Sequence, residues 1–199
     1  MNPLTAACRA YLRWRHSRGF GVHSPFAYDL VKMVVRPGDY EFYGYADIDD
    51  VVLTPGFKGY PEARSDARLL LRLLVQLRTR RLLLPKGLPA MQAAAEAASV
   101  PVVTYQAPAL PTTPATDIVP LPEPEPGDMI VAPLLNLDKD QLAGRLHAGT
   151  VVLALHPDAP DIETIYKACG DRGLIFHGTR LLLAVPRKEM AFVAYTMKF

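Results

Sequence analysis

The sequence predicts an α/β three-layer sandwich, with helices on both faces of a mostly parallel sheet and antiparallel strands at the C-terminal end. Three observations lead to this fold class. The chain has 199 residues, 50% of them apolar and 21% charged, which suits one globular domain with a short appendage. Short apolar segments alternate with helical segments between residues 81 and 170. The last three apolar segments follow one another with turns but no helices between them.

The chain begins with two predicted helices. Residues 4–16 have apolar side chains at helical spacing, which predicts an amphipathic helix. Its apolar face consists of Leu4, Cys8, Tyr11 and Leu12. Ser24 followed by Pro25 is typical of a helix start, because serine caps the first turn and proline fits its first position. A second helix is therefore predicted over residues 25–35, with Phe26 as its anchor.

An ordered loop and a long helix follow. Residues 36–60 contain no lasting hydrophobic period, but their tyrosines and Phe42 must pack on something, so we expect order there. Leucines at helical spacing predict a helix over residues 61–78. The chain therefore divides into an N-terminal helical and loop appendage, residues 1–60, and an α/β domain, residues 61–199.

Strands and helices alternate in the second part of the chain. The predicted strands cover residues 81–84, 100–105, 128–132, 150–155, 174–176, 181–185 and 191–198. The predicted helices cover residues 89–98, 139–147 and 160–170. Seven prolines between residues 107 and 127 exclude a long helix there. Because ligands of such sheets bind at the carboxyl ends of parallel strands, we expect the site in the loops after the first four strands.

Composition excludes several classes of protein. Two cysteines, Cys8 and Cys169, are too few for a disulfide framework, and we expect reduced thiols in a cytoplasmic protein. No apolar run reaches the roughly 20 residues of a membrane span, and no signal-peptide pattern follows Met1. The 22 basic and 20 acidic residues nearly balance, which argues against a dedicated nucleic-acid-binding chain. No metal-ligand spacing or nucleophile motif occurs.

One segment near the N-terminus carries a family resemblance. The stretch Gly19-Phe20-Gly21-Val22-His23-Ser24-Pro25-Phe26-Ala27-Tyr28-Asp29-Leu30 resembles the H-G-V-H-S-P-F-V-F-D segment of a bacterial group of small O-methyltransferase-like proteins. The layout of the chain is similar to that of class I S-adenosylmethionine-dependent methyltransferases, whose seven-stranded sheet ends with an antiparallel strand. The resemblance implies a Rossmann-like methyltransferase fold with S-adenosylmethionine as the family's cofactor.

The first cofactor motif of that family is altered in this chain. The family has E-x-G-x-x-x-G after its first strand, where glycines let the backbone approach the cofactor and the next helix offers free N–H groups. Here the turn reads Leu84-Pro85-Lys86-Gly87-Leu88-Pro89-Ala90-Met91. Gly87 matches the first glycine. Pro85 replaces the acidic residue, and Met91 replaces the last glycine.

Three further acidic positions of the family are also replaced. Gln106 follows the second strand, where the family binds the ribose hydroxyls with an acidic residue. Pro133 takes the acidic position after the strand 128–132. His156 follows the strand 150–155, where the family has an acidic pair. By the resemblance, Gly87 and Gln106 are the cofactor-binding candidates. The other pocket candidates are His23, Asn136, His156 and Asp158.

These replacements predict a methyltransferase-like protein that has lost efficient S-adenosylmethionine binding and serves as a scaffold or interaction protein, with no catalytic residues and no cofactor. Two alternatives stay open. One is an active O-methyltransferase with an atypical cofactor pocket, in which His23 or His156 acts as the base. The other is an adaptor that binds nucleic acid or an acidic partner through surface arginines, among them Arg64, Arg68 and Arg72.

The apolar face of the N-terminal helix is the part of the sequence that suggests a protein partner. Its apolar face is expected to cover apolar surface of its own core or of a second subunit, so a homodimer through the N-terminal helices is one of two predicted arrangements. No membrane partner is expected.

Overall fold

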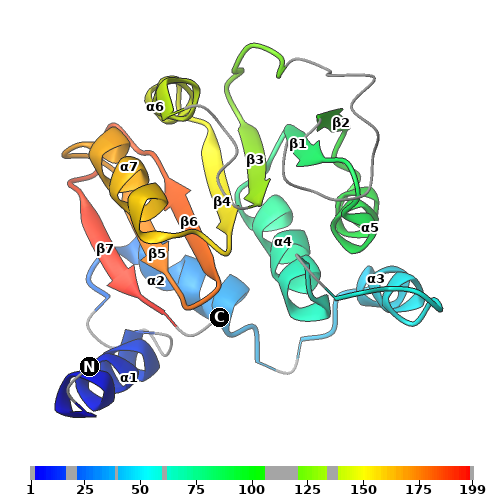
Figure 1. Ribbon diagram of the computed structural model, residues 1–199, viewed down its shortest axis with the longest axis horizontal. Helices are drawn as coiled ribbons and strands as arrows, with labels where there is room; N and C mark the ends of the chain where they lie inside the picture. Colours follow the sequence, from blue (N-terminus) through cyan, green and yellow to red (C-terminus); the bar gives the residue numbers. More distant parts are fainter. Residues whose placement is uncertain are drawn as a thin grey trace.

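The computed structural model describes residues 3–16, 22–38, 40–59, 62–105, 121–133 and 139–197 of the chain. In this part of the chain seven strands form one sheet (Figure 1). The strands are β1 (Arg81–Pro85), β2 (Val102–Tyr105), β3 (Asp128–Pro133), β4 (Val151–Leu155), β5 (Leu174–His177), β6 (Leu181–Val185) and β7 (Val193–Thr196). Their order across the sheet is β2-β1-β3-β4-β6-β5-β7. The predicted α/β class is confirmed, and the predicted strands and helices follow one another in the predicted order, with one additional helix within residues 36–60.

Among the described strands, β6 alone runs against the others. It pairs antiparallel with both β4 and β5, whereas the remaining neighbours pair in parallel. The expected antiparallel end of the sheet is therefore confirmed for β5 with β6 and wrong for β7, which pairs in parallel with β5. The short turn after β5 forces an antiparallel return, and the longer connection after β6 carries the chain across to the free edge of β5.

Helices form the remaining elements. They are α1 (Pro3–His16), α2 (Pro25–Leu30) with its π-helical continuation η1 (Val31–Val35), α3 (Tyr45–Val52), α4 (Arg64–Gln76), α5 (Pro89–Ala97), α6 (Lys139–His147) and α7 (Ala159–Cys169). Ser24 caps α2 as predicted, because its hydroxyl oxygen accepts a hydrogen bond from the Ala27 N–H at 3.3 Å. The long helix is shorter than the predicted span 61–78, since its first turn begins after Ala63.

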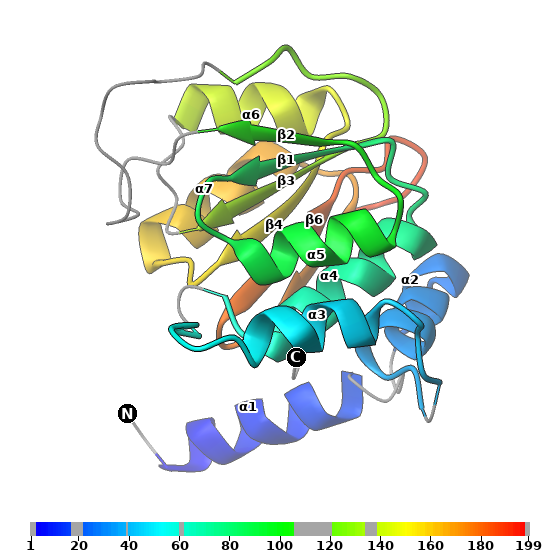
Figure 2. The same ribbon diagram turned by 90° about the vertical axis from the view of Figure 1, so that its right-hand side faces the viewer.

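Helices cover both faces of the sheet (Figure 2), and alternating residues along the strands pack against one set or the other. One face, which includes Leu82 and Leu84, packs in a core with residues of α2, η1, α3, α4 and α5. The opposite face, which includes Leu83 and Ile130, packs in a second core with α6 and α7. The buried parallel strands are apolar on both sides, as a sheet covered by helices requires.

The expectation of a loop over residues 36–60 is wrong for its middle. Helix α3 forms there because Ile48 is fully buried and Val51 and Val52 pack beside it on the same core. The apolar stripe is too short to stand out as a helical period in the sequence. The tyrosines were expected to pack, and only Tyr45 does so, since Tyr40 and Tyr43 are 72% and 102% exposed.

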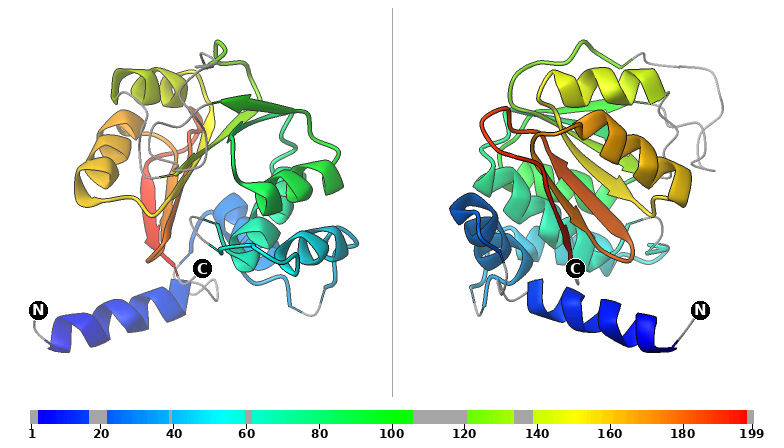
Figure 3. Two further views of the ribbon diagram at one scale, coloured as in Figure 1. Left: turned by 45° about the vertical axis from the view of Figure 1, so that its right-hand side comes forward. Right: turned by 90° about the vertical axis from the view of Figure 1, so that its left-hand side faces the viewer.

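Helix α1 stands apart from the two cores and meets the rest of the chain at β7 (Figure 3). Cys8 is exposed, as are Tyr11 and Leu12. The side chain of Leu4 lies outside the described residues. The expectation that this face covers the chain's own core is therefore wrong, and the alternative of a second subunit stays a prediction. None of the described helices is both long and apolar enough to cross a membrane.

Candidate functional site

The direction of the chain's crossovers reverses at β1, whose neighbours are β2 on one side and β3 on the other. In open α/β sheets, ligands bind beyond the carboxyl ends of the strands at such a switch point. The turn after β1 contains Lys86, whose N–H donates to the carbonyl of Tyr105 at 2.9 Å, and Gly87, whose φ of +91° favours glycine. Gly87 therefore takes a backbone conformation that other residues rarely adopt, and its role in cofactor binding stays a prediction.

The helix after this turn begins on a buried carboxylate. Both oxygens of Glu62 accept hydrogen bonds from the start of α5, one from the Ala90 N–H at 3.0 Å and one from the Met91 N–H at 2.9 Å. Glu62 is only 2% exposed. The positive end of the helix dipole favours a negative group in this position. The chain therefore supplies its own carboxyl oxygens to the helix end that a ligand would otherwise reach.

The other N–H groups of this first turn are also accounted for. Pro89, the first residue of α5, has no N–H. The Gln92 N–H donates to the carbonyl of Leu88 at 3.0 Å as the first bond inside the helix. Among the first four residues of α5, none therefore offers a backbone donor to a bound molecule.

A second buried carboxylate lies one helical turn further along the same segment. Asp66 is 3% exposed and accepts hydrogen bonds from the Ala63 N–H and from the guanidinium of Arg180. Arg180 precedes β6, and its carbonyl accepts a hydrogen bond from the His156 N–H at 2.6 Å. These contacts connect the start of α4 with the end of β4 through Asp66, Arg180 and His156. His156 has a φ of +52° in this position.

The electrostatic environment of Glu62 differs from that of an ordinary surface carboxyl. Burial, helped by the negative charge of Asp66 and opposed by the two N–H bonds, raises the pKa of Glu62 to about 7. A carboxyl with such a pKa exchanges its proton near neutral pH. In an accessible cleft it would suit general acid–base chemistry, but here it is closed off behind the N-terminus of α5.

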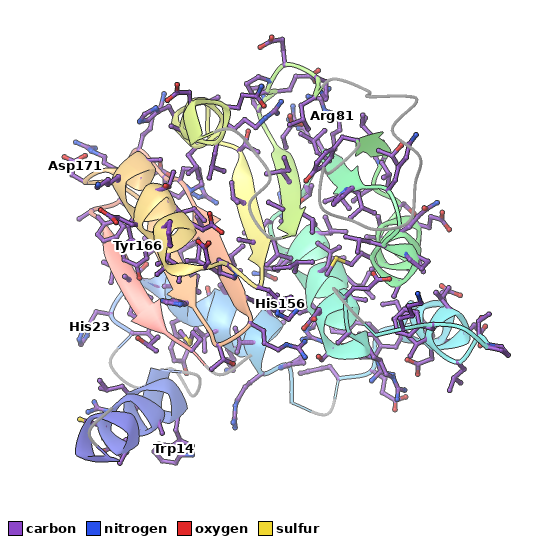
Figure 4. The ribbon with its side chains drawn as sticks, in the orientation of Figure 1. Trp14, His23, Arg81, His156, Tyr166 and Asp171 are labelled. Carbon is purple, nitrogen blue, oxygen red and sulfur yellow. The ribbon has the colours of Figure 1, made fainter. Side chains whose placement is uncertain are left out.

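The remaining predicted site residues do not gather at this place. His23 is exposed in the segment before α2, and Figure 4 shows it well apart from His156. Asp158 caps α7 and accepts the Asp161 N–H at 2.9 Å, so its carboxylate serves its own helix. Gln106 and Asn136 lie outside the described residues. Of the candidates, the structure therefore places Gly87 and His156 at carboxyl ends of strands.

The arginine stripe of α4 is engaged inside the chain. Arg64 and Arg68 both form ion pairs with Asp49 of α3, and the Arg68 guanidinium lies 4.4 Å from the centre of the Tyr45 ring. Arg72 donates to the carbonyl of Val34 at 2.6 Å and to the hydroxyl of Tyr45. These three arginines fix α3 and η1 to α4, which sequence reasoning did not foresee.

Sequence reasoning also missed Glu62, Asp66 and Arg180 as members of the site. Asp66 lies in the first turn of α4 and caps that helix, whereas Glu62 binds the start of another helix, α5. The partners of Glu62 lie 28 and 29 residues away, and Arg180 lies 114 residues from Asp66. No local sequence pattern predicts contacts between residues so far apart in the chain. The one local indication was that Leu88, before Pro89, cannot cap α5 with its side chain, so the cap had to come from elsewhere in the chain.

The described residues contain no group of three or more His, Cys, Asp or Glu side chains that could hold a metal ion. Comparisons of this chain with protein-family models, with curated proteins and with solved structures find no match.

Proposed function

We propose that this protein keeps a methyltransferase-like scaffold without efficient binding of S-adenosylmethionine, and that it acts as a scaffold or interaction protein. The observation that carries the proposal is the use of the α5 N-terminus by Glu62. The family resemblance implies that this helix offers free N–H groups to the cofactor. In this chain the two N–H groups that could do so are already bound to an internal carboxylate.

The sheet supports the methyltransferase-like scaffold at the level of fold class. It is a seven-stranded and mostly parallel sheet with an antiparallel strand near its C-terminal end, which suits a Rossmann-like fold. The strand β1 ends on the buried Pro85, where the family has an acidic residue. A ribose or amino group would therefore meet an apolar ring in place of a charged acceptor, which removes a hydrogen bond worth about 1.5–3 kcal/mol.

Calorimetric titration with S-adenosylmethionine and with S-adenosylhomocysteine tests the proposal. Two lost contacts of this size, if additive, weaken binding by about two to four powers of ten, so we expect no binding at micromolar concentrations. A dissociation constant tighter than about 50 µM for either compound would overturn the proposal, because ligands of this strength need built polar contacts.

A matched pair of variants assigns the cause. Glu62→Ala frees the N–H groups of Ala90 and Met91, whereas Glu96→Ala removes an exposed carboxylate near the other end of α5. If Glu62 closes the site, binding strengthens in the first variant and stays absent in the second. If neither variant binds S-adenosylmethionine, the cause of the lost binding would lie in the turn from Pro85 to Gly87.

One observation favours an active methyltransferase as the second candidate. His156 follows β4 directly, next to the ion pair of Asp66 and Arg180, so an ionisable group does lie at a strand end. In that case His156, and not His23, would be the base. The same titration separates the two functions, since an active enzyme must bind S-adenosylmethionine. The adaptor alternative would have to recruit arginines that already bind Asp49 and Tyr45.

A further inference from the structure

Two surfaces of this chain are complementary to each other in chemical character. The first is the exposed side of α1, which presents Tyr11, Leu12 and Trp14 with exposed fractions of 55%, 39% and 41%. The rings of Tyr11 and Trp14 stack with their centres 6.0 Å apart, and Arg15 lies over Tyr11. Figure 4 shows Trp14 pointing away from the sheet. This helix therefore displays a preformed aromatic face.

The second surface is an apolar cavity formed by η1 and the segment that follows it. It has a volume of about 190 Å³ and is lined by Met33, Pro37, Tyr40, Glu41 and Phe42. Pockets that enclose drug-sized molecules are larger, about 300–1,000 Å³. The cavity therefore suits one large side chain better than a cofactor. Tyr40, which lines it, is 72% exposed.

The charges of the two surfaces are complementary. The sequence of α1 contains three arginines and no acidic residue. Residues 40–52, beside the cavity, contain four acidic residues and no basic one. Asp49 is bound to the arginines of α4, but Glu41, Asp47 and Asp50 form no ion pair with another described residue. Such complementarity selects a partner and fixes its orientation.

We propose that the chain forms a twofold dimer in which α1 of each copy lies on residues 33–47 of the other copy. Trp14 enters the cavity, and Arg15 faces Glu41 at its rim. A helix of 14 residues is about 21 Å long and offers a small contact by itself. Twofold symmetry repeats the contact, which brings the total toward the size of a stable interface. This dimer does not depend on the proposed function.

Sedimentation velocity of the full chain over a range of concentrations tests the dimer. We expect a monomer–dimer equilibrium that is weakened about 30-fold or more by Trp14→Ala and by Tyr40→Ala, because a buried aromatic anchor dominates such interfaces. Glu41→Arg weakens it as well, and the double change Glu41→Arg with Arg15→Glu restores it. Circular dichroism of each variant shows whether the fold is retained.

Two control variants change exposed residues that belong neither to α1 nor to the lining of the cavity. Val75→Ala shortens an exposed side chain at the end of α4, and Asp171→Arg reverses a charge that Figure 4 places far from Trp14. Neither should alter the equilibrium. A chain that stays monomeric at all concentrations would overturn the proposal. A dimer whose stability is unchanged by Trp14→Ala would overturn it too, as would a double charge change that does not restore the dimer. Binding of a monomer through Trp14 to phosphatidylglycerol–phosphatidylcholine vesicles would overturn it in favour of a lipid surface.

Discussion

At the scale of single residues, Glu62 determines what the site can do. Its carboxylate is buried, yet it accepts two N–H bonds and lies close enough to Asp66 to be affected by its charge. Burial penalises the ionised form, and the N–H bonds favour it. The balance raises the pKa of Glu62 from 4.5 to about 7. Folding therefore holds a proton on this group that the unfolded chain releases at lower pH.

This proton makes stability depend on pH. Between about pH 5 and 7 the folded chain keeps the Glu62 proton and the unfolded chain does not, so the free energy of unfolding falls as pH rises. A pKa shift of this size corresponds to a total fall of about 3 kcal/mol from this group, of which about 2 kcal/mol occurs between pH 5 and 7. Urea denaturation of the native chain and of Glu62→Gln over this range measures the effect, because glutamine does not titrate. A difference between the two chains that stays constant with pH, or changes with the opposite sign, would contradict the raised pKa.

Phe26 provides a second test at this scale. A fully buried ring in α2 would make Phe26→Ala cost about 3–5 kcal/mol. The ring is only partly buried, with the guanidinium of Arg187 4.5 Å from its centre, so the expected loss falls to about 1–2 kcal/mol. Urea denaturation of this variant checks the value, and a loss above about 3 kcal/mol would mean that the ring is more deeply packed.

At the scale of elements, α3 depends on close approach to its neighbours. A Cβ added to Gly44 would lie 2.5 Å from the Cβ of Ala97 in α5 and 3.0 Å from Leu71 in α4. Because Ala97 has no freedom to rotate away, α3 would have to shift. We expect Gly44→Ala to lower the free energy of unfolding by about 1–3 kcal/mol.

The matched control is Gly144→Ala in α6, where an added Cβ meets nothing within 4 Å. Alanine favours the helix more than glycine does, so this variant should gain up to about 1 kcal/mol. Urea denaturation of both variants gives the comparison. Similar effects of the two substitutions would show that α3 is not held against α5 as closely as the structure has it.

The sequence predicts elements better than it predicts their neighbours. Strands such as β4 are continuous apolar runs, and Ser24-Pro25 marks a helix start, so local chemistry alone predicts them. The place of β6 inside the sheet depends on how β5 and β7 pair, which no local pattern contains. The carboxylate on α5 was missed for the same reason. Its partners are close only once the fold brings them together.

At the scale of the whole molecule, one part of the N-terminal segment packs into the core and another part, α1, does not. Leu30, Val31 and Ile48 are buried in the same core as the strands and as α4 and α5. Helix α1 adds no buried residue to either core in the described part of the chain. The predicted boundary at residue 60 stays a prediction, and from the shared core we expect residues 22–38 and 40–59 and the sheet to depend on each other for stability.

Two deletions distinguish these relations. Removal of residues 1–21 takes away α1 and leaves both cores covered, so we expect a cooperative unfolding transition with a loss below about 2 kcal/mol. Removal of residues 1–60 uncovers the apolar side of α4 and α5, and no cooperative transition is expected because the buried area that offsets chain entropy is lost. Thermal unfolding followed by circular dichroism, at a concentration where the full chain is monomeric, measures both. A stable, cooperative chain without residues 1–60 would show that the α/β part folds as a separate domain, and a non-cooperative chain without residues 1–21 would show that α1 belongs to the core.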